Sequence, residues 1–296
     1  MIHTTNLFLA SASGFIGSYL YSYLIKDSSI NLFSCTRSIS ANSSPANIPG
    51  INLNCRDDVA RLVESIPPCD VIIYSAAAIN YQIDDLNISD SNCAGIQNIT
   101  YLQKCWSSSL VIYISSIGVI GAPQTLPISE FHPVMPPTSY HASKLFGEHI
   151  VRLLSSKETK AVSLRISAPV GAGMPRHRFL PTLVDRALLG MPILLKGSGA
   201  RIQDYIDIRD IAKLISLLVE KPVSGVFNVA SGNPISNRSL AEKVISVLDS
   251  SSNIIFNNGP DPEENHRWII SCEKLWLETR FKSTVSIEES IRSLVS

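Results

Sequence analysis

Residues 6–26 read NLFLASASGFIGSYLYSYLIK, and this stretch decides the fold class. Its apolar start, 6–10, predicts a buried strand, and residues 18–26 predict a helix. The serines and glycines of 11–17 lie between them as a tight turn. In a strand–turn–helix of this kind, glycines let the backbone approach a pyrophosphate, which then faces the helix N-terminus. Ser11 stands where the first glycine is expected, so the motif alone also fits an ordinary strand–helix connection.

The rest of the first half continues to alternate between apolar strands and helices. The predicted order is strand 30–36, strand 51–55, helix 56–66, strand 70–75, helix 90–106 and strand 110–116. A helix at 139–155 and strands at 161–166 and 226–229 extend the pattern. Such alternation is typical of the α/β class with a doubly wound parallel sheet of the Rossmann type.

The sequence changes character after residue 167. Prolines and arginines interrupt residues 168–200, and the next predicted helix spans 239–248. We therefore expect a dinucleotide-binding Rossmann-type domain over 1–167, to which 201–230 returns. Residues 168–200 and 231–296 are expected to form a smaller C-terminal substrate-binding part.

The composition excludes several classes of function. Lys+Arg and Asp+Glu both number 25, so the net charge is zero, and neither a nucleic-acid nor an acidic partner is expected. The six cysteines form no C-x-x-C pair, which predicts reduced thiols in a cytoplasmic protein and no metal site. No apolar run reaches the ~18 residues of a membrane span. The apolar stretch 7–20 lacks the basic start of a signal peptide.

Three polar side chains indicate the chemistry. Ser116 closes the apolar run 110–114, and Tyr140 and Lys144 lie four residues apart in a predicted helix. Residues four apart share one helix face, so the phenol and the ammonium are expected one turn apart. A phenol beside an ammonium can act as an acid–base group near neutral pH.

The chain resembles the extended short-chain dehydrogenase/reductases, in the NAD-dependent epimerase/dehydratase branch that mostly handles nucleotide sugars. The resemblance covers nearly the whole length. It rests on Gly14-Phe15-Ile16-Gly17, the alanines 76–78, Ser115-Ser116, Tyr140-x-x-x-Lys144, Leu164-Arg165, and Asp204-Tyr205-Ile206-Asp207-Ile208 with Asp210.

The resemblance implies a division of labour in a hydride-transfer site. Tyr140 would exchange the proton at the substrate oxygen, and Lys144 would lower the pKa of the phenol and hold the nicotinamide ribose. Ser116 would hydrogen-bond the carbonyl. Asn92 matches a family asparagine near the cofactor, although it also fits an ordinary polar helix residue.

The predicted cofactor is NADP, with NAD as the alternative. Where NAD-binding chains usually carry an acidic residue, this chain has Arg37 between Thr36 and Ser38, which suits a 2′-phosphate but also fits a solvated loop. The small residues 76–78 let a flat ligand lie against the backbone, or simply pack closely. The expected cofactor contacts are Ser11, Ser13, Gly14, Phe15, Ile16, Gly17, Arg37, Asn54, Cys55, Ala76, Ala77, Ala78, Asn92, Tyr140 and Lys144.

Besides Ser11, several departures from the family pattern fall on the substrate side. Ala168 replaces an asparagine that contacts the nucleotide sugar, and Gln203 replaces an arginine that often grips the diphosphate. Arg201, Arg176 and Arg178 are candidates to substitute, and each equally fits a solvated surface charge. The expected substrate contacts are Ser116, Arg176, Arg178, Arg201 and Gln203.

Three functions remain open at this point. The first is NADPH-dependent reduction of a 4-keto nucleotide sugar, the second a nucleotide-sugar 4-epimerase with tightly bound NAD, and the third a catalytically idle NAD(P)-binding protein. A dehydratase is disfavoured because Ile117-Gly118 follows the serine in place of an acidic pair. By resemblance, helices 90–106 and 139–155 are expected to form a homodimer.

The neighbours of the catalytic pair on its helix are expected to be structural. His141 and Ser143 should point away from Tyr140 and Lys144. Glu148 is expected to make a surface or helix-pairing contact.

Overall fold

The computed structural model describes residues 4–37, 47–79, 85–257 and 259–295. The chain divides into two compact units. Unit 1 comprises residues 1–121, 134–165 and 212–227, and unit 2 comprises 122–133, 166–211 and 228–296.

Unit 1 is built on a seven-stranded parallel sheet, which confirms the predicted doubly wound Rossmann-type fold. The strand order is β11-β6-β5-β4-β1-β2-β3, with β1 in the interior. The chain adds β2 and β3 on one side of β1 and then β4 and the later strands on the other side, so the strand order reverses between β1 and β4. Residues 7–10 of β1 are fully buried, as a central parallel strand requires. The strands are β1 (Thr5–Ala10), β2 (Ile30–Cys35), β3 (Asn47–Ile48), β4 (Val71–Tyr74), β5 (Leu110–Ser116), β6 (Lys160–Ile166) and β11 (Gly225–Val229).

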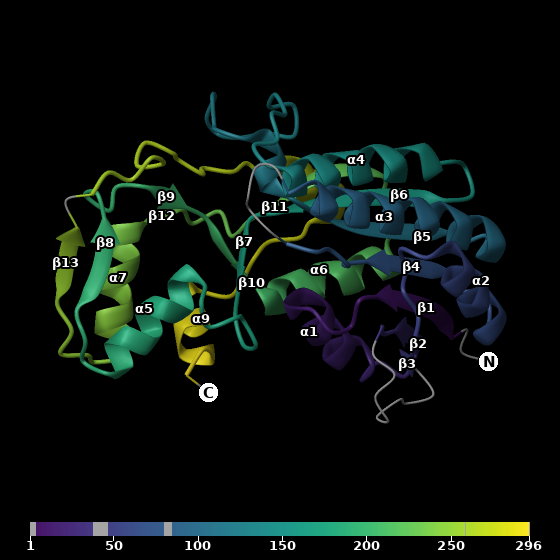
Figure 1. Cartoon of the computed structure of the whole chain (residues 1–296), viewed down its shortest axis with the longest axis horizontal. Coiled ribbons are helices and arrows are strands. Elements are labelled where there is room, and N and C mark those ends of the chain that lie inside the picture. The colour runs from purple at the N-terminus through teal and green to yellow at the C-terminus, as the bar shows by residue number, and fades with distance from the viewer. Residues whose placement is uncertain (1–3, 38–46, 80–84, 258, 296) are drawn as a thin grey trace. The chain divides into compact units, whose positions relative to one another are not determined.

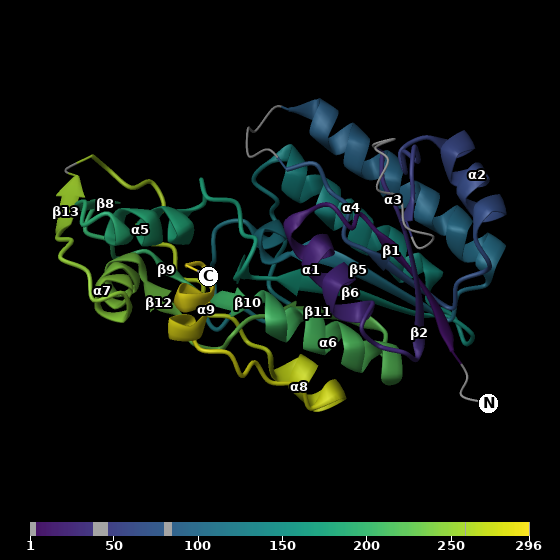
Figure 2. The same cartoon turned by 90° about the horizontal axis from the view of Figure 1, so that it is seen from below.

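Helices cover both faces of this sheet. Helices α3 (Leu86–Trp106) and α4 (Ser139–Leu154) lie side by side above it in Figure 1, whereas α1 (Phe15–Leu24) and α6 (Ile208–Glu220) lie below it. Figure 2, seen from below, shows α1 and α6 in front of the strands. Helix α2 (Arg56–Ser65) packs beside α3. The homodimer expected through α3 and α4 stays a prediction.

Helix α4 lies unusually close to the sheet. A Cβ atom at Gly147 would overlap the hydroxyl group of Tyr113, which projects from β5. Only glycine permits this approach, because any larger residue would push the helix outward. Gly147 therefore fixes the distance between the helix that carries Tyr140 and the strand that ends at Ser116.

The strand predicted at 51–55 was wrong, because this stretch forms a turn. The amide of Asn54 donates to Asn52 Oδ1 (3.2 Å), and the amide of Cys55 donates to Asn52 O (2.9 Å). Asparagine side chains that bond the nearby backbone favour turns over strands. Ile51 and Leu53 are nevertheless buried, which explains the apolar pattern.

The described residues of unit 2 form three small two-stranded sheets and four helices. Its core is formed by apolar residues of α5, α7, α9 and β8, such as Leu183 and Leu240. The sheets pair β7 (Ala168–Val170) with β10 (Tyr205–Asp207), β8 (Ile193–Lys196) with β13 (Ile254–Asn257), and β9 (Ile202–Gln203) with β12 (Ile235–Ser236). The helices are α5 (Phe179–Leu188), α7 (Asn237–Val247), α8 (Glu273–Thr279) and α9 (Ile287–Ser293).

The segment before α9 is held by two buried aspartates. Asp210 accepts hydrogen bonds from Ser283 Oγ (2.6 Å), from the amide and hydroxyl of Thr284 (2.8 and 3.0 Å) and from the amide of Val285 (2.8 Å). Asp207 accepts from Ser290 Oγ at 2.6 Å. These carboxylates anchor residues 283–290 to unit 2.

Within the part of the chain that the structure describes, none of the helices has the length and apolar character needed to cross a bilayer.

Candidate active site

The candidate site begins at the carboxyl edge of the sheet in unit 1. Cys35, Ala10, Tyr74 and Tyr113 form one row across β2, β1, β4 and β5, because each is paired in register with the next. The predicted functional residues follow this row directly in the chain. Ligands of doubly wound sheets bind outside this edge, at the point where the strand order reverses.

The turn after β1 has the backbone that the motif predicts. Ser11 has φ = 71°, in the left-handed region that glycine prefers. The serine therefore adopts the backbone conformation expected of the glycine that it replaces. A Cβ atom at Gly17 would overlap the carbonyl oxygen of Ser11. Gly14 caps α1 without any side-chain hydrogen bond, and both Ser13 and Gly14 are exposed. No side chain therefore caps the first amides of α1, and Phe15 and Ile16 lie in the same turn.

The residues expected around the adenosine end lie after β2 and before α2. Arg37 is exposed just beyond β2, and Ser38 lies outside the described residues. Asn54 donates through Nδ2 to Ser91 Oγ (2.7 Å), and Cys55 caps α2. Asn54 is therefore fixed in orientation by α3, which leaves its cofactor contact a prediction.

The alanine segment after β4 is tied to α4 through Asn92. The amide of Ala78 donates to Asn92 Oδ1 (2.8 Å), and Asn92 Nδ2 donates to Ala78 O (3.1 Å). The same Nδ2 donates to Ser143 Oγ (3.0 Å), which in turn donates to Tyr140 O (2.7 Å). Asn92 and Ser143 thus join the expected cofactor-binding backbone to the helix turn that carries Tyr140. Ala76 and Ala77, which precede Ala78, are half-buried.

Ser116 lies where β5 gives way to a short 3-10 helix, η1 (Ile117–Ile120). Its Oγ accepts from the amide of Gly118 (3.2 Å), and the residue is half-buried. The hydroxyl hydrogen stays available for another acceptor, because an oxygen that accepts one bond can still donate one.

Tyr140 and Lys144 lie in the first two turns of α4. Thr138 caps the helix by accepting from the amide of His141 (3.3 Å), after two prolines that cannot join a helix interior. Lys144 Nζ is 5.9 Å from the ring centroid of Tyr140 and donates to Ile114 O (2.8 Å). Since Ile114 is two residues before Ser116, the structure brings the tyrosine and lysine together behind the strand end that carries the serine.

The Lys144 ammonium is held in a dry environment. Burial lowers the pKa of Lys144 to about 7, while the negative charge of Glu148 acts in the opposite direction. The ring of Tyr113 lies 5.0 Å from Nζ. A lysine with this pKa changes its charge near neutral pH, as an acid–base site requires.

His141 follows Tyr140 and contacts it edge to face, with ring centroids 5.0 Å apart. Its Nδ1 is 2.8 Å from Thr138 Oγ1. Burial lowers the pKa of His141 to about 4, so the imidazole is neutral at physiological pH. It therefore adds no positive charge beside Tyr140.

The prediction that Glu148 makes a surface or helix-pairing contact was wrong. Glu148 is 4% exposed and forms a buried ion pair with Arg165 on β6, where Arg165 Nη2 donates to Oε2 at 2.8 Å. Sequence reasoning missed this pair because helical spacing says nothing about a partner on a strand. The sequence feature that could have predicted the pair is Arg165 inside the apolar run 160–166, because an arginine on a buried strand needs a partner of opposite charge.

Apart from Ser116, which is in unit 1, the predicted substrate residues belong to unit 2, and all of these contacts remain predictions. Arg176 pairs with Asp185 and donates to Leu294 O (2.8 Å), and Arg201 pairs with Glu263. Arg178 is half-buried at the start of α5. Gln203 differs, because its Oε1 is buried and finds no donor among the described residues.

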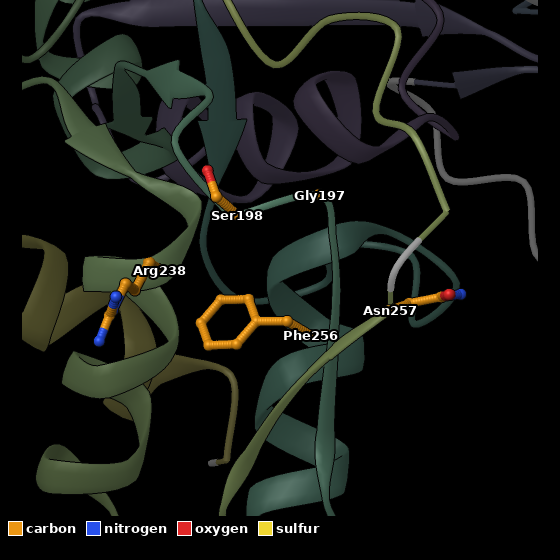
Figure 3. Close-up of a pocket in the computed structure, with 5 residues that line it drawn as sticks. All are labelled: Gly197, Ser198, Arg238, Phe256 and Asn257. Atoms are coloured by element: carbon orange, nitrogen blue, oxygen red, sulfur yellow. The ribbon is translucent and has the colours of Figure 1, made fainter.

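Among the described residues, unit 2 includes the following two hollows. The first has a cavity volume of 370 Å³, and in Figure 3 the Phe256 ring points toward Arg238, whose guanidinium carbon is 5.4 Å from the ring centroid. Gly197, Ser198 and Asn257 complete its lining. The second, of 350 Å³, lies beside Trp276 of α8. Neither brings together a phenol and an ammonium as α4 does. Across the described ranges, no group of three or more metal-ligating side chains could hold a metal ion.

The fold and the Ser–Tyr–Lys arrangement define a dinucleotide-binding enzyme of the short-chain dehydrogenase/reductase type. The chain belongs to the NAD-dependent epimerase/dehydratase family, whose model matches residues 9–230. The expected resemblance is therefore confirmed.

Relatives within this family carry different activities. The chain is 26% identical over 218 residues to a dTDP-4-dehydro-6-deoxyglucose reductase of Escherichia coli, covering 70% of this chain and 68% of the relative. It is 24% identical over 300 residues to a protein of Methanocaldococcus jannaschii provisionally named a UDP-glucose 4-epimerase, covering 98% and 97%.

Solved structures share the fold at lower identity. A UDP-glucose 4-epimerase from Thermotoga maritima, crystallised with UDP-glucose, superposes with a TM-score of 0.87 at 17% identity, covering 98% of this chain and 97% of that one. Structures of this fold include complexes with NAD and with NADPH.

Proposed function

We propose that this protein is an NADPH-dependent reductase of a 4-keto nucleotide sugar. One observation carries the proposal: α4 holds the Tyr140 phenol and the Lys144 ammonium one turn apart, behind the strand end that carries Ser116. Reduction of a ketone needs a proton donor and a hydrogen-bond donor at the oxygen, and these residues supply both.

The turn between β1 and α1 fits a dinucleotide. The left-handed backbone of Ser11, the close approach at Gly17 and the side-chain-free cap at Gly14 leave room for a pyrophosphate at the first turn of α1. NADPH, when bound, supplies the hydride. Residues 11–17 and 76–78 would orient it, and Lys144 would hold its nicotinamide ribose.

The residues of the chain would then handle the substrate oxygen. Ser116 Oγ donates a hydrogen bond to the ketone, and Tyr140 gives its proton to the same oxygen as it gains negative charge. The Lys144 ammonium stabilises the phenolate that Tyr140 becomes. The buried location of Tyr140 and Lys144 strengthens this electrostatic effect, because little water competes there.

Arg37 supports NADP over NAD. It is an exposed guanidinium one residue beyond Thr36 at the end of β2, where a 2′-phosphate would add negative charge. NADPH serves net reduction, which favours a reductase.

The nucleotide-sugar assignment draws on the relatives and on Gln203. Both curated relatives are named for nucleotide sugars. The buried Gln203 Oε1, which the described residues leave without a donor, provides an acceptor for a ligand hydroxyl or amide.

The second candidate is a nucleotide-sugar 4-epimerase with tightly bound NAD. It is supported by the Methanocaldococcus relative, which aligns along almost the whole chain. An epimerase oxidises and then re-reduces the same carbon, so it would purify with a nucleotide and consume no added NADPH.

The test is a spectrophotometric screen of NADPH and NADH oxidation against a panel of nucleotide 4-keto sugars. We expect turnover of at least one member with NADPH, and a loss of about 10²–10⁴-fold in Tyr140→Phe with an unchanged melting temperature. Tyr101→Phe, at a half-buried position of α3, 39 positions earlier, is the matched control and should keep full turnover. No oxidation with any member would overturn the reductase proposal, and co-purified NAD would point to the epimerase.

A further inference from the structure

A buried polar cluster lies directly beneath the candidate acid–base pair. Glu148 is one helical turn beyond Lys144, and both of its oxygens are engaged. Oε1 accepts from Ser115 Oγ (2.6 Å) and Arg165 Nε (2.9 Å), and Oε2 accepts from Arg165 Nη2 (2.8 Å). Ser115, Glu148 and Arg165 are each at most 5% exposed and come from β5, α4 and β6.

The contacts of Glu148 are those of a carboxylate. A bidentate guanidinium and a hydroxyl group donate to it, and the guanidinium bonds are charge-assisted. The fixed negative charge therefore lies one turn from the Lys144 ammonium, because residues four apart are neighbours on a helix face.

Few other charges face Lys144. On α4 the titratable residues one turn from Lys144 are Tyr140, the neutral His141 and Glu148, and on β5 the nearest is Tyr113. On β6, the charged Arg165 is bonded to Glu148. Burial raises the pKa of Tyr113 well above its usual range, so it stays a neutral phenol. From the layers behind it, Tyr74 stacks on Tyr113 at 6.0 Å and Cys93 of α3 also lies nearby, each with a pKa raised by burial. The residues of η1 carry no titratable side chain.

We propose that Glu148, fixed by Arg165 and Ser115, is a positioning residue that shifts the Lys144 side chain toward its ammonium form behind Tyr140. This role deepens the proposed function and rests on it in one respect, namely that Tyr140 and Lys144 form the acid–base pair. Glu148 touches neither substrate nor cofactor in this assignment, and it acts only through Lys144.

The balance at Lys144 makes the role sensitive to a single charge. Burial disfavours the ammonium and the Glu148 charge favours it, and with both effects the pKa of about 7 leaves the two forms nearly equal at neutral pH. Loss of the nearby carboxylate charge would move the balance to the neutral amine, which cannot stabilise a phenolate. The positive charge of Arg165, no longer offset by the Glu148 carboxylate, would add to this effect.

A purely structural ion pair predicts the opposite response. Breaking a buried pair loosens its surroundings and admits water, and hydration moves a buried lysine back toward its ordinary pKa of 10.5. The direction of the shift therefore separates the two roles.

The experiment is an NMR titration of the full chain with ¹³Cε-labelled lysines, without cofactor or substrate. Lys144→Arg identifies the Lys144 resonance by its disappearance. Glu148→Gln should lower the titration midpoint of Lys144 by on the order of one pH unit, about a tenfold change in the equilibrium. Arg165→Gln, which leaves the carboxylate and removes its partner cation, should leave the midpoint unchanged or raise it.

The result that would overturn the proposal is a Glu148→Gln midpoint equal to or higher than that of the parent chain. If Glu148→Gln does not fold, the double change Glu148→Gln/Arg165→Gln removes both buried charges. It should still lower the midpoint, by less than the single change, and a higher midpoint would again contradict the proposal.

The titration is independent of the substrate. A lowered midpoint together with no turnover of any 4-keto sugar would leave Glu148 in its role and reject the proposed reaction. A raised midpoint together with measurable turnover would do the reverse.

Discussion

Two buried charged residues, Asp210 in unit 2 and Lys144 in unit 1, differ in how many hydrogen-bond partners stabilise their charge. Asp210 in unit 2 accepts four hydrogen bonds from residues 283–285, and these outweigh the effect of burial, so the pKa of Asp210 is lowered. Lys144 in unit 1 donates to a single carbonyl, that of Ile114, and burial dominates its pKa. A buried charge with a full set of partners anchors a fold, whereas one with few partners is held close to changing its state.

The largest effect on stability is expected from removing the Asp210 carboxylate. Asp210→Ala removes four charge-assisted hydrogen bonds and should lower the free energy of unfolding by about 3 kcal/mol, measured by urea denaturation. Because the pKa of Asp210 is depressed in the folded state, its contribution is present above about pH 4 and is lost as the pH falls through the folded value.

Glu242→Gln is the matched control for Asp210→Ala. Glu242 pairs with Arg238 on the exposed surface of α7, and its loss should change stability by less than about 0.5 kcal/mol. If both variants lowered the free energy of unfolding equally, the number of hydrogen bonds to a carboxylate would not explain how much it stabilises the fold.

A smaller effect, on the pH dependence of stability, is expected from removing the Lys144 ammonium. The folded pKa of Lys144, about 7, lies below its ordinary value of 10.5, so the unfolded chain binds the extra proton between these values and stability rises with pH. Lys144→Met should lack this rise. The stability difference between the parent chain and the variant should change by about 2 kcal/mol from pH 7 to pH 9, measured by urea denaturation. Parallel pH curves for the two proteins would contradict the prediction.

The smallest effect concerns a strained backbone rather than a charge. Ser11 has a left-handed backbone immediately after β1, whereas Ser107 and Arg280, which share that conformation, end helices. Ser11→Gly should raise the free energy of unfolding by about 0.5–1 kcal/mol, because glycine adopts this conformation without a steric cost. Ser13→Gly, in the same turn without positive φ, should instead lower it slightly by loosening the unfolded chain. Thermal unfolding of the two variants side by side would reveal whether they differ in sign.

The sequence predicted the features that depend on local pattern. Alternating apolar runs and helical spacing determined the doubly wound sheet, and the Tyr140–Lys144 spacing placed both side chains on one face of α4. Even the Ser11 turn followed the glycine pattern, since the backbone kept the conformation that the motif requires.

The features that escaped prediction join residues far apart in the chain or depend on local competition. Glu148 meets Arg165 across a helix and a strand, and Asp210 meets residues 283–285, and neither pairing has a sequence period. At 51–55 the apolar pattern correctly indicated burial, but the Asn52 side chain accepts a hydrogen bond from a nearby backbone amide and stabilises a turn instead of a strand.

The partners of Asp207 and Asp210 also set an order of events during synthesis. Ser283 lies 73 positions after Asp210, and Ser290 lies 83 positions after Asp207. At roughly 5–20 residues per second, a ribosome needs on the order of 4–16 seconds to supply these donors after the aspartates have emerged. Strand β11, the last strand of the sheet in unit 1, ends at Val229 and is made well before them. The nascent chain can therefore complete the sheet while Asp210 still lacks its donors at 283–285 and Asp207 is bonded to Arg209 but not yet to Ser290.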